Sequence, residues 1–355
     1  VAASGMASAG GFDRSGQDIS ILYEDGDAIK LSFASVTPSI DGTYAPSGAE
    51  SGNMAESYTS VGLSYKQQFN DKMSMALVYD QPYGAKVNYK DSTQPEVLGA
   101  TAELNSRSLK LIGQYSFNEN VSVHAGVNAE WLSATISNPL AGSLNYKGEA
   151  SEDFNTGFIV GASYEIPDIA LRASVSYFSE IKHSHDVTES SIASLPAEVN
   201  GKSEIVMPRS VNVDFQTGIA ADTLAFASLR WAEWSKTSVN PPHYAQVTGT
   251  TLFEIKENVM SYSLGVGRKL SDNLSGSVSV GYEKSNGGVS SNLAPTDGQR
   301  SVAVGLRYTI DNIKIAGGIR YVEFGDTTTS VPGGDTGTFD GNTATALGVS
   351  VTYAF

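Results

Sequence analysis

The sequence contains no cysteine and no long apolar run. Without cysteine, a disulfide framework, a thiolate zinc site and a cysteine nucleophile are all excluded. No stretch approaches the roughly 18 to 20 apolar residues that a membrane-spanning helix needs. The 355 residues include 23 Lys and Arg against 38 Asp and Glu, a formal net charge of -15. This shortage of basic residues argues against a nucleic-acid partner, because phosphate binding needs a basic face.

No Pro-rich or Gly/Ser-rich linker divides the chain, and no block of charge separates two halves. Barrels often exceed the usual domain size as one unit, so we expect one domain with a small N-terminal appendage. Near the start, Ala7-Ser8-Ala9 is typical of the cleavage site of a secretory signal. This indicates an exported protein and leaves open whether residues 1–9 belong to the mature fold.

Alternation with a period of two recurs from Ile29 to the last residue, which predicts strands rather than helices. From Ser301 to Ile310, for example, large apolar residues alternate with Ala303, Gly305 and Arg307. Such strands have one apolar and one polar face.

The predicted connections fall into two alternating kinds. The short, polar ones are 70–72, 118–120, 167–168, 221–223, 271–273 and 311–312. The long ones, rich in Gly, Ser, Thr, Asn and Pro, are roughly 41–56, 89–101, 138–152, 184–208, 239–256, 285–298 and 327–342. Short turns at one end and long loops at the other indicate an up-and-down meander.

The segments number about fourteen, each near the nine to eleven residues of a tilted transmembrane strand. We therefore predict an all-β fold: a transmembrane antiparallel β-barrel in the outer membrane of a Gram-negative bacterium. Aromatic residues near predicted strand ends, such as Tyr115 and Phe117, suit the girdles of such a barrel. Scattered aromatics in a soluble all-β protein are the alternative explanation.

The last segment, 345–355, places Leu347, Val349, Val351, Tyr353 and Phe355 on one face. This ending on an aromatic residue resembles the terminal signature of bacterial outer-membrane proteins. The resemblance implies recognition by the barrel-assembly machinery.

The order of these features resembles the FadL family of outer-membrane transporters for long-chain fatty acids and other hydrophobic compounds. The resemblance rests on Met207–Phe215, on Leu229–Ser235, on an interrupted third strand and on Tyr353-Ala354-Phe355. It implies that residues 1–28 include a hatch folded into the lumen, at about 10–28, and that residues 29–355 form the barrel. Ile21–Gly26 stands where family members usually carry an Asn-Pro-Ala stretch, so we expect different gating.

The third strand is interrupted after Tyr79 by Asp80-Gln81-Pro82-Tyr83-Gly84. Proline cannot donate to a strand ladder, so the strand either ends at Tyr79 or continues to about Tyr89 through a kink. A stop would leave it short of the far side of the membrane. The family resemblance implies that Tyr79–Gly84 forms a lateral gate, through which an apolar ligand enters the bilayer.

Four cations have the parity of lumen-facing residues: Lys110, Arg172, Arg307 and Arg320. A carboxylate ligand needs such a cation, and the mid-strand positions of Lys110 and Arg320 favour these two as ligand contacts. Pairing with lumen acids such as Glu130 or with hatch acids is the alternative. In the hatch, Phe12, Ile21, Leu22 and Tyr23 are candidates for lining a binding pocket or for anchoring the plug.

Signatures of enzymes are weak. His183-Ser184-His185-Asp186 is too compact in sequence for a catalytic triad and predicts an exposed loop. Apolar residues at 184–208, including Ile205 and Met207, suggest a capture surface or a loop packed over the barrel mouth. The acidic loop at 335–342 lacks EF-hand spacing, and we expect it to contact lipopolysaccharide.

The sequence thus predicts a monomeric barrel that passively admits long-chain fatty acids or similar hydrophobic molecules. It implies no catalytic residue, no cofactor and no metal. A general diffusion porin for small polar solutes is the alternative. A barrel enzyme acting on lipid is a third class, for which the sequence offers no nucleophile–His pair.

Overall fold

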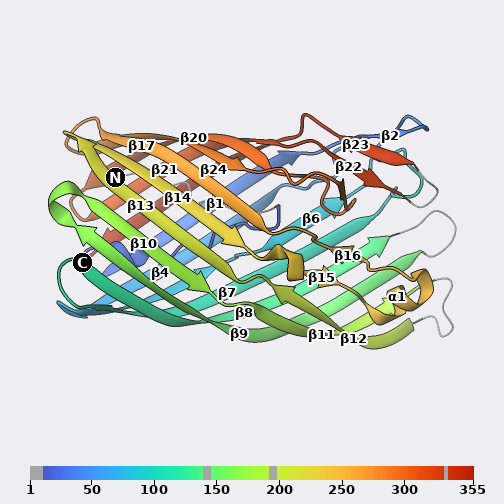
Figure 1. Ribbon diagram of the computed structural model, residues 1–355, viewed down its shortest axis with the longest axis horizontal. Helices are drawn as coiled ribbons and strands as arrows, with labels where there is room; N and C mark the ends of the chain where they lie inside the picture. Colours follow the sequence, from blue (N-terminus) through green and yellow to red (C-terminus); the bar gives the residue numbers. More distant parts are fainter. Residues whose placement is uncertain (1–10, 139–144, 192–197, 332–334) are drawn as a thin grey trace.

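The computed structural model describes residues 11–138, 145–191, 198–331 and 335–355, which form a closed antiparallel β-barrel (Figure 1). Seventeen strand segments make fourteen strands, because β5 and β6, β10 and β11, and β12 and β13 are pairs that each continue one strand across an interruption. β1 pairs with both β24 and β4, which closes the sheet. The prediction of about fourteen strands is confirmed.

The barrel strands have the following bounds: β1 Ala28–Ser39, β4 Tyr58–Asn70, β5 Met73–Asp80, β6 Gly84–Asn88, β7 Thr101–Ser116, β8 Val121–Asn138, β9 Tyr146–Ile166, β10 Leu171–Phe178, β11 Ile181–Ser190, β12 Glu198–Met207, β13 Ser210–Ala220, β14 Thr223–Ala232, β17 Val259–Lys269, β18 Leu274–Glu283, β20 Gln299–Ile310, β21 Ile313–Phe324 and β24 Thr343–Ala354.

The remaining elements are short. β2 (Thr43–Ala45), β3 (Ala49–Glu50), β19 (Val289–Ser290), β22 (Thr327–Ser330) and β23 (Thr336–Phe339) form a small separate sheet. β15 (Ser238–Val239) pairs with β16 (Phe253–Glu254), and α1 (Pro242–Thr248) lies between them in sequence. Three 3-10 turns complete the fold: η1 Ser20–Tyr23, η2 Pro167–Ile169 and η3 Trp234–Lys236.

The two ends of the barrel differ as the connections predict. β2, β22, β23 and α1 lie at one end, and the short turns and the C-terminus lie at the other (Figure 1). Asp222 and Asp311 occupy the left-handed region in two of these turns, with φ of 55° and 49°, a conformation that Asp tolerates better than most residues. In outer-membrane barrels the short turns are periplasmic and the long loops extracellular.

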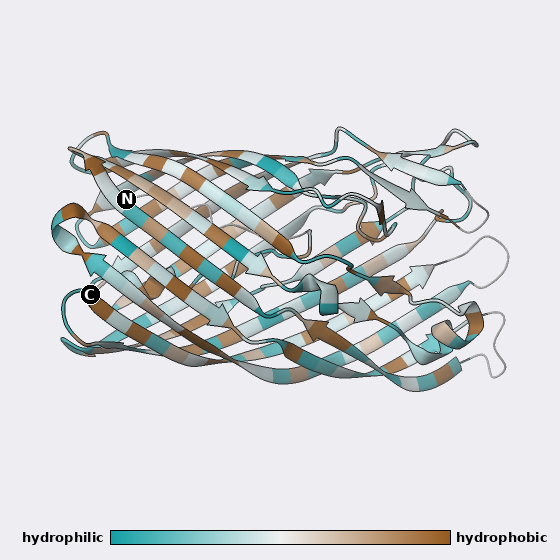
Figure 2. Ribbon diagram, in the orientation of Figure 1, coloured by the Kyte–Doolittle hydropathy of each residue, from teal (hydrophilic) through white to brown (hydrophobic). Residues whose placement is uncertain are grey.

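Apolar and polar residues alternate along the strands (Figure 2). On β20, Val304 and Leu306 are 52% and 53% exposed, whereas their neighbours Ala303, Gly305 and Arg307 are less exposed. Exposing a Leu or Val side chain to water forgoes roughly 1.5–3 kcal/mol of burial free energy. Because such residues surround the barrel, its outer surface suits a bilayer. No helix of the described residues is long and apolar enough to cross a membrane.

The structure corrects several predictions. The loop predicted at 138–152 is shorter, because β9 begins at Tyr146. Residues 184–208 do not form one long loop, because β11 and β12 extend to Ser190 and from Glu198, with only residues 192–197 outside the described part. His183 and His185 are fully buried on β11 rather than exposed in a loop. Alternation alone did not show this, because Ser184 and Asp186 make the stretch look hydrophilic throughout.

Backbone pairing between β9 and its neighbour in the wall, β10 and β11, is interrupted. β9 pairs with β10 at 159–166 and with β11 only at 147–150. Between these ladders, His183 Nδ1 lies 3.1 Å from Asp153 Oδ2 and His185 Nδ1 lies 2.7 Å from the Ser151 carbonyl. Side chains therefore bridge the two strands where backbone pairing is missing.

Candidate functional site: a break in the barrel wall and an inner pocket

The third strand is broken between β5 and β6, as the proline and glycine predict. β4 pairs with β5 only as far as Leu63 and Tyr79. Beyond that point, residues 58–62 of β4 pair with β1 and lack a ladder partner on their other side within the described chain. β6 resumes pairing with β7 at Gly84 and Asn105. The predicted continuation through a kink is confirmed.

The break lies at the level of the apolar belt, because Val61 and Leu63 on β4 are 43% and 44% exposed on the outer surface. Beyond the break along the third strand, the edge of β6 is hydrogen-bonded to the segment that precedes β4, where Asn88 N donates to the Met54 carbonyl. Across it, Val61 N donates to Gln81 Oε1 at 3.2 Å. A side chain thus occupies the place of a strand.

Residues 11–27, which we call the N-terminal segment, support the break from the lumen side. Arg14 N donates to the Pro82 carbonyl at 2.8 Å, and Gly84 N donates to the Phe12 carbonyl at 2.9 Å. Asp13 and Tyr83 form an antiparallel bridge. Pro82 has no backbone N–H, but no hydrogen bond to β4 is lost by this, because the ladder between β4 and the third strand ends before Pro82.

The Arg14 side chain lies directly against Gly84. A Cβ built on Gly84 would overlap the Arg14 guanidinium, so a larger residue here would displace that side chain. The same guanidinium lies over the Tyr58 ring, 4.1 Å from its centroid. Arg14 therefore spans the break from β6 to β4 on the lumen side, a role that its position in the sequence did not reveal.

Two further contacts hold the N-terminal segment. The buried Asp13 carboxylate pairs with the buried Arg230 guanidinium, with 2.5 Å between Oδ2 and Nε. Gln17 Nε2 donates to Tyr83 Oη at 2.7 Å. A buried ion pair is costly to break because one charge is then left without its partner, so these contacts fix the segment beside the broken strand.

Comparison with known proteins decides the family. The family model "Outer membrane protein transport protein (OMPP1/FadL/TodX)" matches residues 22–355. The chain belongs to this family. It is therefore an outer-membrane transport protein, and the resemblance inferred from the sequence is confirmed. No curated protein matches the chain.

Solved structures of FadL/TodX proteins share the fold. A Pseudomonas aeruginosa FadL homologue is 14% identical, with a TM-score of 0.78 over 93% of this chain and 91% of that one. The Pseudomonas putida toluene transporter TodX is 14% identical, with a TM-score of 0.67 over 94% and 91%. The Ralstonia pickettii toluene transporter TbuX is 13% identical, with a TM-score of 0.62 over 94% and 90%.

In this FadL-family barrel, Lys110 is fully buried and its ammonium is engaged. It donates to Asp80 Oδ1 and, at 2.8 Å, to Ser108 Oγ. Asp80, the last residue of β5, also accepts hydrogen bonds from Ser108 and from Ser15 of the N-terminal segment. The network joins the end of the broken strand to β7 and to the N-terminal segment.

Arg320 has a different setting. It lines a cavity of about 370 Å³ inside the break, together with Arg14, Ser60 and Gln81. Within the described chain, no acidic group lies within ion-pair distance of Arg320. Arg14 and Arg320 thus place two cations beside the lateral break.

The four predicted candidates in the N-terminal segment separate in space. Ile21 and Leu22 belong to a buried apolar cluster that includes Ile112 and Phe178, and Tyr23 packs against this cluster. Arg172 lies over the Tyr23 ring, 4.3 Å from the centroid. These three residues anchor the segment, and of the four only Phe12 lines the apolar pocket described next.

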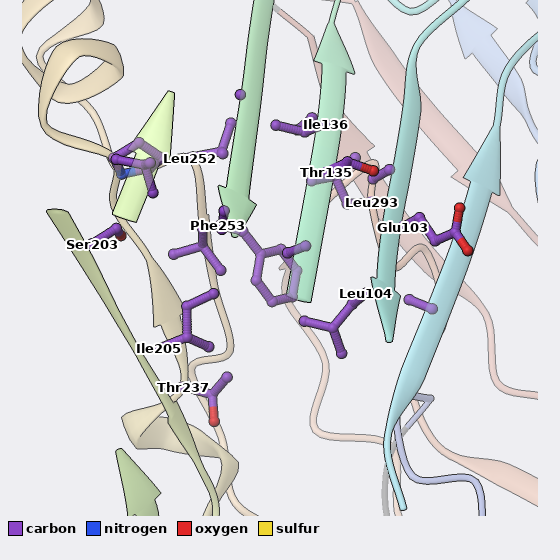
Figure 3. Close-up of a pocket in the computed structure, with 18 of the residues that line it drawn as sticks. Glu103, Leu104, Thr135, Ile136, Ser203, Ile205, Thr237, Leu252, Phe253 and Leu293 are labelled. Carbon is purple, nitrogen blue, oxygen red and sulfur yellow. The ribbon is translucent and has the colours of Figure 1, made fainter. Parts of the chain in front are cut away.

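An apolar pocket of about 90 Å³ is lined by Phe12 of the N-terminal segment and by residues of β7, β8 and β12 (Figure 3). Leu104, Ile205 and Phe253 point into it from three different elements (Figure 3). Phe12 and Trp234 also line it, with ring centroids 6.0 Å apart. The pocket joins an outer vestibule of about 810 Å³, because Phe12, Trp234 and Phe253 line both spaces.

The periplasmic end of the lumen is charged instead. A cavity of about 290 Å³ there is lined by Lys30, Arg172, Arg307, Lys314, Asp18, Glu24, Asp25 and Asp214. Lys314 and Glu24 form an ion pair, and Lys30 Nζ lies 2.9 Å from Asp18 Oδ2. All three arginines predicted to face the lumen line this cavity or the one beside the break. An apolar solute meets charged groups if it continues toward the periplasm.

Proposed function

We propose that this FadL-family protein is a passive channel for long-chain fatty acids or similar hydrophobic molecules, which it releases sideways into the outer membrane. The observation that carries the proposal is the unpaired edge of β4 at residues 58–62, opposite Gln81–Gly84 and within the apolar belt. A ligand would enter the vestibule, occupy the apolar pocket and leave through this break.

The physical argument for lateral release is the cost of the other exit. Hydrating an apolar chain costs about 0.8 kcal/mol per methylene. The periplasmic cavity is lined by eight charged residues, including Lys30, Glu24 and Asp214. The break instead opens beside Val61 on the lipid-facing surface, where an apolar chain keeps apolar surroundings.

The N-terminal segment acts as the hatch in this proposal. It separates the apolar pocket, lined by Phe12, from the cavity inside the break, lined by Arg14 and Ser15. Passage requires this segment or the Gln81 side chain to move. Lys110 then has a positioning role, since it holds Asp80 at the edge of the break, and Arg320 is the better candidate for contact with a polar ligand group.

Several partners belong to the same proposal. Phe355, whose N–H donates to the Asp27 carbonyl, ends the closing strand on the aromatic residue that the barrel-assembly machinery would recognise. The acidic extracellular loops would contact lipopolysaccharide. The barrel functions as a monomer, because its pocket and its break are built within one chain.

Uptake by cells of a Gram-negative strain lacking its own channel of this family tests the proposal. We expect the protein to accelerate uptake of a labelled long-chain hydrophobic solute, with little effect on a small sugar. A general diffusion porin would give the opposite pattern. Sugar uptake without hydrophobic uptake would therefore overturn the proposal.

A further inference from the structure

The apolar pocket contains a polar atom that has no partner. Ser203, on β12, is 6% exposed and lines the pocket (Figure 3). Its Oγ makes no hydrogen bond to any described residue, and Ile205 and Met207 on the same face of β12 make the surroundings apolar. Burying a hydroxyl without a partner is unfavourable, and native structures usually satisfy such groups with a partner or a ligand.

A second unpartnered atom lies on the neighbouring strand. His185 of β11 is the cross-strand partner of Ser203, and its buried Nε2 has no hydrogen bond within the part of the chain that the structure describes. His185 Nδ1 lies 2.7 Å from the Ser151 carbonyl. Since that carbonyl can only accept, Nδ1 carries a proton, and in the neutral ring Nε2 is an acceptor. The two strands therefore offer a hydroxyl and an acceptor nitrogen that do not satisfy each other.

The pocket offers nothing to a carboxylate. Within the described chain, no Lys, Arg or His lines it. The one fully buried acid in its wall is Glu189, whose carboxylate accepts hydrogen bonds from Tyr146 Oη and from the backbone N–H groups of His243 and Tyr244. A carboxylate in this pocket would be desolvated without a counter-charge and would lie near a like charge.

The vestibule at the entrance is also unfavourable for an anionic ligand. The vestibule is lined by five acids and two lysines: Glu96, Glu254, Glu257, Glu283, Asp297, Lys256 and Lys284. Residues 1–10, 139–144, 192–197 and 332–334 contain no Asp, Glu, Lys or Arg, so their side chains add no charge to this count. An anionic head group therefore finds no net attraction along the entrance.

We infer that the pocket binds an uncharged hydrophobic molecule that carries one hydroxyl or carbonyl group, with Ser203 as its hydrogen-bonding partner. This inference rests on the proposed function and narrows its substrate class to neutral alcohols, ketones or esters, as opposed to fatty-acid anions. An apolar cavity of about 150 Å³ holds benzene. At about 90 Å³, this pocket encloses only the functional end of such a molecule, and the remainder extends into the vestibule.

The test is uptake of 1-decanol, decane and decanoate at pH 8 by cells with and without the protein. We expect the protein to accelerate decanol uptake most and decanoate uptake least. Ser203→Ala should reduce the decanol rate by about three- to tenfold, the effect of one neutral hydrogen bond. It should leave the decane rate unchanged. Ser122→Ala, at a lumen serine of β8 that lines none of the cavities described above, is the matched control and should change neither rate.

The outcomes separate the two proposals. If the protein accelerates none of the three solutes, the proposed function itself fails. If decanoate enters as fast as decanol, or if Ser203→Ala slows decanol and decane equally, transport stands and the assignment of a neutral polar ligand to this pocket is overturned.

Discussion

The Gln81 side-chain oxygen accepts a hydrogen bond from the Val61 backbone N–H at 3.2 Å, across the break between β4 and the third strand. In a closed barrel this N–H would bond to a neighbouring strand, because lipid-exposed backbone groups have no water to bond. One flexible side chain thus replaces part of a strand ladder.

Gln81→Ala removes this contact and leaves the backbone of β4 unchanged. Because Gln81 contributes a single neutral hydrogen bond, we expect the rate of hydrophobic uptake to rise by roughly two- to tenfold. Gln81→Glu, which keeps an acceptor at the same length, is the matched control and should stay closer to the wild-type rate. Slower uptake by Gln81→Ala would contradict a gating role.

Gly84→Ala forces a rearrangement at the break. The new methyl group would overlap the Arg14 guanidinium, so Arg14 must leave its position over Tyr58. We expect the barrel to fold, since Arg14 is a flexible side chain, and amide exchange at 12–14 to increase. Hydrogen exchange with mass spectrometry measures this change. Unaltered exchange would show that Arg14 does not fix the segment, and Ala85→Gly is a control on the same strand.

Asp13→Asn removes the carboxylate that faces the buried Arg230. Leaving one charge of a buried pair without its partner costs about 3–5 kcal/mol. We expect this loss to appear as release of the N-terminal segment, measured by protease cleavage within 11–20, while the barrel remains folded. The double variant Asp13→Asn with Arg230→Met removes both charges and should recover part of the protection. Equal cleavage of wild type and Asp13→Asn would contradict this assignment.

Acid should loosen the same segment at Asp18. Burial alone would raise the pKa of its carboxyl, but the Lys30 ammonium and hydrogen bonds from Ser20 outweigh burial and lower the pKa to about 2. The pKa of an Asp side chain in the unfolded chain is about 3.9. The stabilisation is therefore complete above that value and is lost as pH falls from about 4 toward 2.

Hydrogen exchange of residues 18–23 as a function of pH, corrected for intrinsic rates, measures this effect. We expect constant protection between pH 8 and about 5 and a decline below about 4. Asp18→Asn should abolish the decline. A transition near neutral pH, or one that Asp18→Asn leaves in place, would assign the acid sensitivity to other groups.

Local patterns predicted the barrel and the break. Alternation gave the outward face of β20, short polar pairs such as Asp311-Asn312 gave the turns, and Pro82 with Gly84 gave the interruption. These features depend on a few neighbouring residues, so a single sequence contains them.

Contacts between distant residues could not be predicted in this way. Asp13 and Arg230 are 217 positions apart, and nothing in either neighbourhood indicates the other. Lys110 and Arg320 both have the alternation of lumen-facing residues, yet of these two cations it is Lys110 that forms an ion pair with Asp80. The apolar pocket was not predicted, because Trp234 and Phe253 belong to very short elements outside the barrel strands, where alternation gives no signal. Ser203 is noticeable only once its neighbours are known to be apolar.

The central claim is that ligand leaves through the break, and the most direct measurement is uptake after the break is closed. Replacing Gln81-Pro82-Tyr83-Gly84 with Val-Thr-Val-Thr keeps Asp80 with Lys110 and restores a regular strand opposite residues 58–62 of β4. Heat-dependent migration on a gel verifies that the barrel is folded. We expect uptake of a labelled long-chain hydrophobic solute to fall at least about tenfold. Uptake at the wild-type rate by the folded variant would contradict lateral release.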